Sequence, residues 1–268
     1  MKENGNVKQW GEKEEILVFL HYFGGAAVSW QWVAERLSDS FRCIAIDLPG
    51  FGNAAPLEHP SIEGFTAFVQ QELQKLDVET YTLIGHSMGG KIAMQLAATA
   101  PAQSVNALIL IAPSPPTVEN MPAEEKKRML NHPNKQEAEK TVKKVTKKSL
   151  TDEQYKLAIE TQLIIDHNTW RWWLLEGMNH SIADQVKKIE TPITILASED
   201  DPAITYDEIQ KEVVAILKGA RLITTKGVGH LIPMESPKWL ADQIRQAAVR
   251  KVPSGCFQDI KFALSKNQ

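Results

Sequence analysis

The segment Tyr81-Thr82-Leu83-Ile84-Gly85-His86-Ser87-Met88-Gly89-Gly90 carries an apolar run straight into a turn in which two spaced glycines flank a serine. The run at 81–84 predicts a buried strand, and the apolar residues that recur after the turn predict a helix. This is the G-x-S-x-G pattern in a strand–turn–helix context. We expect strained backbone at Ser87, and glycine is needed at 85 and 89 because side chains there would collide with neighbouring main chain. The pattern predicts a nucleophilic Ser87 hydroxyl, exposed off the end of a sheet.

Short apolar runs alternate with segments of helical period on both sides of this turn. Their continuous apolar character is typical of strands buried on both faces of a parallel sheet, and the alternation predicts an α/β fold with helices flanking the sheet. The strands are expected at 16–20, 43–46, 81–84, 107–111 and 193–197, with a more polar edge strand at 221–225. The helices are expected at 30–37, 61–76, 89–100, 209–217 and 237–249.

One long segment interrupts this alternation. Pro113-Ser114-Pro115-Pro116 is a stiff exit from the strand at 107–111, and no convincing strand follows until the next run at 193–197. The segment 118–188 is polar and helical, and we interpret it as an insertion that sits on top of the sheet. The chain would then consist of a first core part at 1–117, the helical insertion at 118–188, and a second core part with a C-terminal tail at 189–268.

Composition excludes several classes of protein. The 268 residues carry a formal net charge of −3, which gives no reason to expect nucleic acid as a partner. No apolar run approaches the roughly 20 residues that span a bilayer, and the polar start at 1–15 predicts no signal peptide. Cys43 and Cys256 form neither a zinc pattern nor a disulfide framework. A buried, reduced Cys43 is consistent with a cytoplasmic protein.

A serine hydroxyl is a weak nucleophile and needs a base. His230 lies in the loop at 227–233, which follows the last predicted strand and therefore sits at the carboxyl edge of the sheet. The base in turn needs a carboxylate to hold its tautomer. Three acids follow the strand at 193–197, and any one of them can reach inward: Glu199, Asp200 and Asp201.

Other candidate side chains are expected to have ordinary structural roles. We expect Lys91, just past the turn, to face solvent. Four further histidines lie in polar or irregular segments, where surface placement is expected: His59, His132, His167 and His180. The cluster Trp170, Trp172 and Trp173 fits the core of the helical insertion better than a substrate platform.

With these features in place, the sequence resembles the α/β-hydrolase family from Leu17 to about Val249. The resemblance rests on the turn at 85–90 and on four further motifs: His21-Tyr22-Phe23-Gly24-Gly25 with Ser29-Trp30, Asp47-Leu48-Pro49-Gly50-Phe51-Gly52, the acid strand at 192–202, and the histidine loop at 229–237. The insertion at 118–188 is similar to the family's helical cap. Alignment on the acid strand selects Asp201, and a shift of one residue selects Asp200.

The resemblance also implies an oxyanion hole and a pocket. The donors would be the backbone amides of Phe23 and Met88. Tyr22 stands where the family usually has glycine, which leaves the Phe23 amide open to question. The apolar pocket is expected to include Tyr22, Trp170, Trp173 and Leu231.

The function that the resemblance implies is that of a cofactor-free, carboxylesterase-like serine hydrolase with Ser87, His230 and Asp201 as its catalytic residues. The substrate is expected to be a small molecule with an apolar acyl group, and no cofactor, metal or membrane span is predicted. The same residues would serve a lactonase, a carbon–carbon bond hydrolase or a haloperoxidase-like perhydrolase. A ligand receptor without turnover is a further alternative, and both a monomer and a homodimer remain open.

Overall fold

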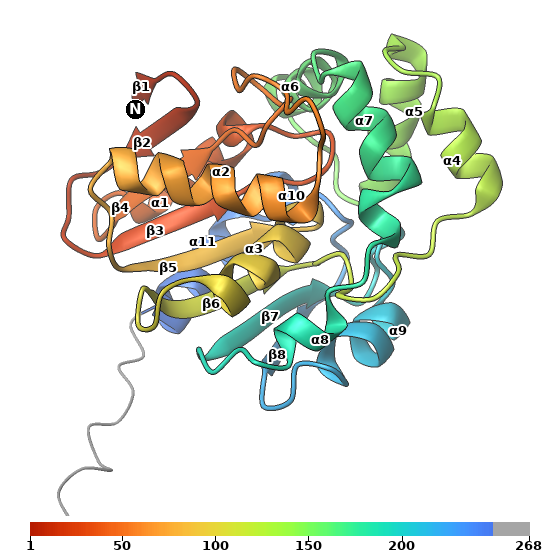
Figure 1. Cartoon of the computed structure of the whole chain (residues 1–268). Coiled ribbons are helices and arrows are strands. Elements are labelled where there is room, and N and C mark those ends of the chain that lie inside the picture. Colours follow the sequence, from red (N-terminus) through yellow and green to blue (C-terminus); the bar gives the residue numbers. More distant parts are fainter. Residues whose placement is uncertain (249–268) are drawn as a thin grey trace, which may run out of the picture.

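A central sheet of eight strands organises the computed structural model, which describes residues 1–248 (Figure 1). The strands lie in the order β1-β2-β4-β3-β5-β6-β7-β8, and the six from β3 to β8 are parallel. This confirms the expected mostly parallel sheet, with β8 at an edge. The strands are β1 (Lys2–Asn4), β2 (Val7–Trp10), β3 (Ile16–Leu20), β4 (Arg42–Ile46), β5 (Tyr81–His86), β6 (Val105–Ile111), β7 (Ile193–Ser198) and β8 (Arg221–Thr225).

Two strands, β1 and β2, were not expected from the sequence. They are antiparallel additions to the other edge, where Val7 pairs with Ile46 and Trp10 with Cys43. Their residues are mostly polar and their pairing is set by the neighbouring strand, so apolar periodicity gives little signal for them.

The flanking helices agree with the expected ones apart from one segment. The expected helix at 209–217 is a single α-helical turn, α9 (Tyr206–Glu208), followed by the π-helix η3 (Ile209–Val214). The remaining helices outside the segment 118–188 are the 3₁₀ helix η1 (Ala27–Trp30), α1 (Gln31–Leu37), α2 (Ile62–Lys75), α3 (Met88–Thr99), α10 (Ile232–Glu235) and α11 (Pro237–Ala248).

Each face of the sheet has its own hydrophobic core, because alternate residues of a strand point to opposite faces. On β3, Val18 and Leu20 pack in the core that includes residues of α2 and α3, whereas Leu17 and Phe19 pack with residues of α1 and α11. In Figure 1, α2 and α3 lie in front of the sheet and α11 lies behind it. The parallel strands are therefore covered on both sides.

The chain between β6 and β7 contains helices joined by irregular segments and no strand. Figure 1 shows α4 to α7 gathered on the side toward which the parallel strands point. The domain boundaries at 117/118 and 188/189 stay a prediction. The helices of this segment are α4 (Ala123–Met129), α5 (Lys135–Val145), α6 (Asp152–Leu163), α7 (His167–Leu175), the 3₁₀ helix η2 (Gly177–Asn179) and α8 (Ala183–Val186).

Several expectations concern the ends of the chain and its cysteines. Cys43 is a buried free thiol, as expected. Val249, Cys256 and the tail at 252–268 lie outside the described residues, and with them the possible packing of the tail on a second subunit. None of the helices within residues 1–248 combines the length and the apolar character that crossing a membrane requires.

Candidate functional site

The turn between β5 and α3 holds Ser87 in a strained conformation. Its φ is +53° and its ψ is −119°, a region that costs a side-chain-bearing residue about 1–3 kcal/mol. A Cβ at Gly85 would lie 2.4 Å from the carbonyl oxygen of Gly89, and a Cβ at Gly89 would lie 2.5 Å from the carbonyl oxygens of Leu20 and His21. Both glycines are therefore required sterically, as the sequence indicated.

The structure brings Ser87, His230 and Asp201 together from three separate loops. The Nδ1 atom of His230 lies 2.8 Å from Oδ2 of Asp201, and its Nε2 atom lies 2.9 Å from Oγ of Ser87. All three side chains are buried. A neutral imidazole has one donor and one acceptor, so Nδ1–H donates to the carboxylate and Nε2 accepts from the hydroxyl.

Asp201, and not Asp200, contacts the imidazole. The second carboxylate oxygen of Asp201 accepts hydrogen bonds from the amides of Ala203 (2.8 Å) and Ile204 (3.1 Å), which fix the orientation of the side chain. Asp200 is exposed and accepts from the amide of Gly227 at 2.7 Å. Of the two aspartates left open by the sequence, Asp201 is the one that lies within hydrogen-bond distance of His230.

The surroundings of His230 raise its pKa above the usual value. Burial alone favours the neutral ring, but the Asp201 carboxylate outweighs it, and Glu119 and Glu235 add to the effect. The imidazole is thus stabilised in its protonated form.

Sequence reasoning missed Glu235, which holds the histidine loop in place. Its carboxylate accepts hydrogen bonds from the amides of Gly229 (2.8 Å) and Leu231 (3.1 Å), on either side of His230. It also accepts from the amides of Lys147 and Lys148, which follow α5. One buried carboxylate therefore ties the loop to the segment 118–188. The one sequence feature that could have indicated this role is that Glu235 lies five residues after His230, within the histidine loop at 229–237.

The loop with Tyr22 and Phe23 bends at glycines that follow the tyrosine. Gly24 has a φ of +104°, and a Cβ at Gly25 would lie 2.5 Å from the tyrosine ring. Among residues 1–248, the amide of Phe23 donates to no protein acceptor. Met88 is the first residue of α3, where amides have no partner inside the helix. Tyr22 therefore does not prevent this loop from turning sharply, because Gly24 and Gly25 supply the bend.

A cavity of about 170 Å³ opens over Ser87 and His230. Three of the four predicted pocket residues line it: Tyr22, Trp173 and Leu231. The prediction for Trp170 is wrong. Its ring stacks on the far side of Phe23, with centroids 4.1 Å apart, and its Nε1–H donates to the carbonyl of Met129. Phe23 lines the cavity and so separates it from Trp170.

The expectation that Lys91 faces solvent is also wrong. The side chain is completely buried, and its ammonium donates to the carbonyl oxygens of Thr117 (2.8 Å) and Met178 (3.3 Å). These carbonyls lie near the two ends of the segment 118–188, so Lys91 joins α3 to both. Burial lowers the pKa of Lys91 to about 8.

His132, expected at the surface, is buried as well. Its ring stacks on Trp170 with centroids 4.2 Å apart, and Nε2–H donates to the carbonyl of Gln162. Within residues 1–248, no group of three or more His, Cys, Asp or Glu side chains is placed to hold a metal ion.

Comparison with known proteins agrees with this architecture. The alpha/beta hydrolase fold family model matches residues 15–237. A curated relative, the dihydrolipoyllysine-residue acetyltransferase component of the acetoin cleaving system of Cupriavidus necator, is 36% identical over 104 residues, which make up 38% of this chain and 28% of that protein. The aligned part thus spans less than a third of that relative.

Two solved structures have the same fold over most of their length. An esterase from Exiguobacterium antarcticum superposes with a TM-score of 0.83 at 16% identity, covering 90% of this chain and 94% of the esterase. An enol-lactonase from Burkholderia xenovorans LB400 superposes with a TM-score of 0.78 at 18% identity, covering 91% and 96%. The superpositions show a shared fold, and the family match supports the expectation of a hydrolase enzyme. Because the family model covers most of the sequence, the chain belongs to the alpha/beta hydrolase fold family.

Proposed function

We propose that the protein is a cofactor-free serine hydrolase that cleaves carboxylic esters with a small, mostly apolar acyl group. The observation that carries this proposal is that His230 lies within hydrogen-bond distance of both Ser87 and Asp201, and that Ser87 and His230 line a cavity. A serine hydroxyl that donates to a buried imidazole, itself oriented by a carboxylate, is the arrangement that makes serine nucleophilic.

In the first half of the reaction, Nε2 of His230 takes the proton of the Ser87 hydroxyl as Oγ attacks the ester carbonyl. The imidazolium that forms is stabilised by Asp201 and then gives its proton to the departing alkoxide, so that an alcohol leaves and an acyl-serine remains. In the second half, the same imidazole takes a proton from water, and the hydroxide attacks the acyl group. Collapse of this second intermediate releases the acid and restores Ser87.

The negative charge on the tetrahedral oxygen needs hydrogen-bond donors within about 3 Å of that oxygen. The amides of Phe23 and Met88 are proposed for this role, since the first lacks a protein partner among the described residues and the second opens α3. The positive end of the helix macrodipole favours the same charge. One such donor is worth about 3–4 kcal/mol of transition-state stabilisation.

The cavity sets the size of the substrate. Its volume of about 170 Å³ is close to that of an engineered cavity of roughly 150 Å³ that holds one benzene molecule. Aromatic and aliphatic side chains of Phe23, Trp173 and Leu231 form much of its wall. We therefore expect acyl groups of about four to eight carbons to fit, and chains of twelve or more to fit poorly.

A panel of p-nitrophenyl esters from acetate to palmitate tests the proposal, with Ser87→Ala as the inactive control. The expected result is an initial burst of one nitrophenolate per wild-type molecule, a maximum of kcat/KM at short or medium chains, and no burst in Ser87→Ala. Lactones, a carbon–carbon bond substrate and a perhydrolysis assay run alongside separate the alternatives with the same residues. A wild-type protein that binds the esters without turnover would be a ligand receptor instead.

A further inference from the structure

A second acid, Glu119, shares the cavity with Ser87 and His230 and has no part in the proposed mechanism. Its side chain lies in the chain segment that leads from β6 into the helices above the sheet, and it is half-buried against the cavity wall. An acidic group inside an apolar cavity costs free energy unless it is satisfied by specific partners.

Two hydrogen bonds connect Glu119 to the turn at Ser87. The Ser114 hydroxyl donates to Oε2 of Glu119 at 2.5 Å, and the Ser114 amide donates to the carbonyl oxygen of Ser87 at 3.0 Å. The Glu119 amide donates to the carbonyl of Met178 at 2.9 Å, so the main chain is fixed as well. The carboxyl is thus held in register with the nucleophile by rigid, buried neighbours.

Only one oxygen of this carboxyl is used by the protein. Among residues 1–248, Oε1 of Glu119 accepts no hydrogen bond, and no lysine or arginine nitrogen lies within ion-pair distance. Burial raises the pKa of Glu119, and the Ser114 hydroxyl and the Lys91 ammonium offset this rise only in part. Lys91 does not line the cavity, and its ammonium donates to the carbonyls of Thr117 and Met178. An acceptor is left free at the cavity wall.

The other charges of the cavity neutralise one another. Lys144 and Glu125 form an ion pair at 2.7 Å, and Glu125 is also paired with Arg128 at 2.5 Å. Gln162 lines the cavity but carries no charge. Glu119 is therefore the charged cavity-lining group whose polarity a ligand has to match.

We propose that Glu119 is a specificity-determining residue, and that the cavity takes esters whose acyl or alcohol part carries a hydroxyl or amino group that donates to its carboxyl. The inference rests on the proposed ester hydrolysis at Ser87. A donor on the substrate satisfies Oε1, whereas an unsubstituted chain leaves it buried without a partner, and an anionic substituent meets a like charge. The cavity thus selects by polarity in addition to size.

The test compares esters of nearly equal size: ethyl butanoate, ethyl 3-hydroxybutanoate, ethyl 3-aminobutanoate and ethyl hydrogen succinate, with propyl butanoate and 2-hydroxyethyl butanoate for the alcohol side. For the wild type we expect kcat/KM at least about tenfold higher for the best donor-bearing ester than for its plain counterpart, the effect of one hydrogen bond to a charged group. The succinate ester should be about tenfold worse than the butanoate. The hydroxyl and amino arms show which donor is preferred.

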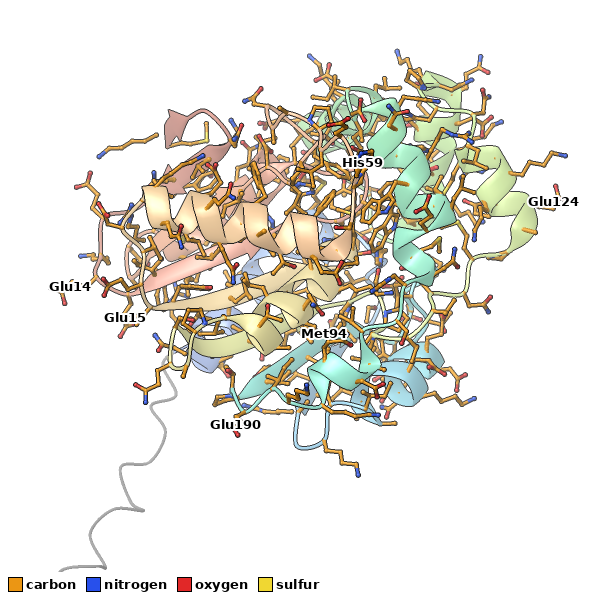
Figure 2. All side chains as sticks on the ribbon, in the orientation of Figure 1. Glu14, Glu15, His59, Met94, Glu124 and Glu190 are labelled. Atoms are coloured by element: carbon orange, nitrogen blue, oxygen red, sulfur yellow. The ribbon has the colours of Figure 1, made fainter. Side chains whose placement is uncertain are left out.

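In Glu119→Gln, which keeps the size of the side chain, the preference for the donor-bearing ester should fall to about twofold or less and the succinate ester should improve. Ser114→Ala, which leaves the carboxyl but frees Oε2, should weaken the preference partially. Glu124→Gln is the matched control, because Glu124 belongs to α4 and points away from the body of the molecule (Figure 2). Glu124→Gln removes the same charge and should leave unchanged the ratio of kcat/KM between each substituted ester and its plain counterpart.

The inference would be overturned if the ratio of kcat/KM between donor-bearing and plain esters were the same in the wild type and in Glu119→Gln. A wild-type preference for the anionic ester would also overturn it. Either result counts against the inference even if ester hydrolysis is confirmed. Calorimetric binding of the same esters to Ser87→Ala and to the double variant Ser87→Ala/Glu119→Gln makes the comparison without turnover. If no ester is hydrolysed, the proposed function fails, and these binding ratios still support or refute the role of Glu119. Thermal unfolding of each variant identifies one that fails to fold, in which case Ser114→Ala serves as the test.

Discussion

The Nε2 atom of His86 donates a hydrogen bond to the main-chain carbonyl of His230 over 2.9 Å. The residue that precedes Ser87 therefore holds the loop whose imidazole faces the same serine. Burial, followed by the charge of His230, keeps the pKa of His86 well below its usual range. His86 remains neutral when its neighbour becomes protonated, so this contact persists through the proposed reaction.

Replacement of His86 tests this support. We expect His86→Ala to lower the free energy of unfolding by about 1–3 kcal/mol, because the carbonyl of His230 is left buried without a donor. It should also lower kcat at least tenfold by loosening the imidazole. His86→Gln can still donate and should recover part of both losses. Urea denaturation and steady-state kinetics provide the measurements, with His59→Gln at the exposed residue labelled in Figure 2 as control.

Replacement of Asp201 and replacement of Asp200 should have different effects on kcat. Asp201→Asn keeps the shape of the side chain but removes the charge that orients His230, and should lower kcat by about a thousandfold or more. Asp200→Asn alters an exposed contact with the amide of Gly227 and should change kcat less than threefold. A large loss in the Asp200 variant, with none in the Asp201 variant, would mean that the carboxylate is misassigned.

Because the pKa of His230 is raised, kcat/KM should depend on pH in a defined direction. The neutral ring is the proposed base, so kcat/KM should rise with pH and reach half its maximum above 6.5, the usual histidine value. In Asp201→Asn the same midpoint should move to lower pH. An acid optimum near pH 4 would contradict the assignment of His230 as the base.

The free energy of unfolding should depend on pH in the opposite direction. Protonated His230 stabilises the fold below about pH 6.5, and this contribution is lost as the pH rises through the raised pKa.

Shortening a side chain that lines the cavity should enlarge it and so change the preferred length of the acyl chain. Val142 lies on α5, is buried and lines the cavity. Val142→Ala should shift the preferred acyl chain upward by one or two carbons, because it adds volume at the wall. Val69→Ala is a matched control, since this buried valine of α2 packs in the core beside the sheet and lies away from the cavity. Comparison of the chain-length profiles of both variants tests the proposed limit.

The parts of this architecture that the sequence predicted are those set by local pattern. Continuous apolar runs predicted five of the six parallel strands, the sixth was predicted as a more polar edge strand, and the glycine spacing around Ser87 predicted the turn. Each of these features depends on residues close in sequence. The short polar strands β1 and β2 escaped prediction because their pairing with β4 comes from the rest of the sheet.

Several residues that sequence reasoning misplaced or missed are polar or charged groups whose partners lie far away in the sequence. Lys91 looks like a solvent-facing helical lysine until the carbonyls of Thr117 and Met178 close over it. Glu119 looks like part of a polar linker, and only the fold places it beside Ser87 and His230. Nothing in the local sequence encodes these approaches, because each depends on how the segment 118–188 packs on the sheet.

Reaction with a fluorophosphonate, followed by intact mass and peptide mapping, tests the central claim most directly. An activated serine should form one phosphonyl adduct on the peptide that contains Ser87, and the rate should fall steeply in His230→Ala. Ser87→Ala should form none. A wild-type protein that forms no adduct, or an adduct that persists in Ser87→Ala, would contradict the proposal that this serine is the nucleophile.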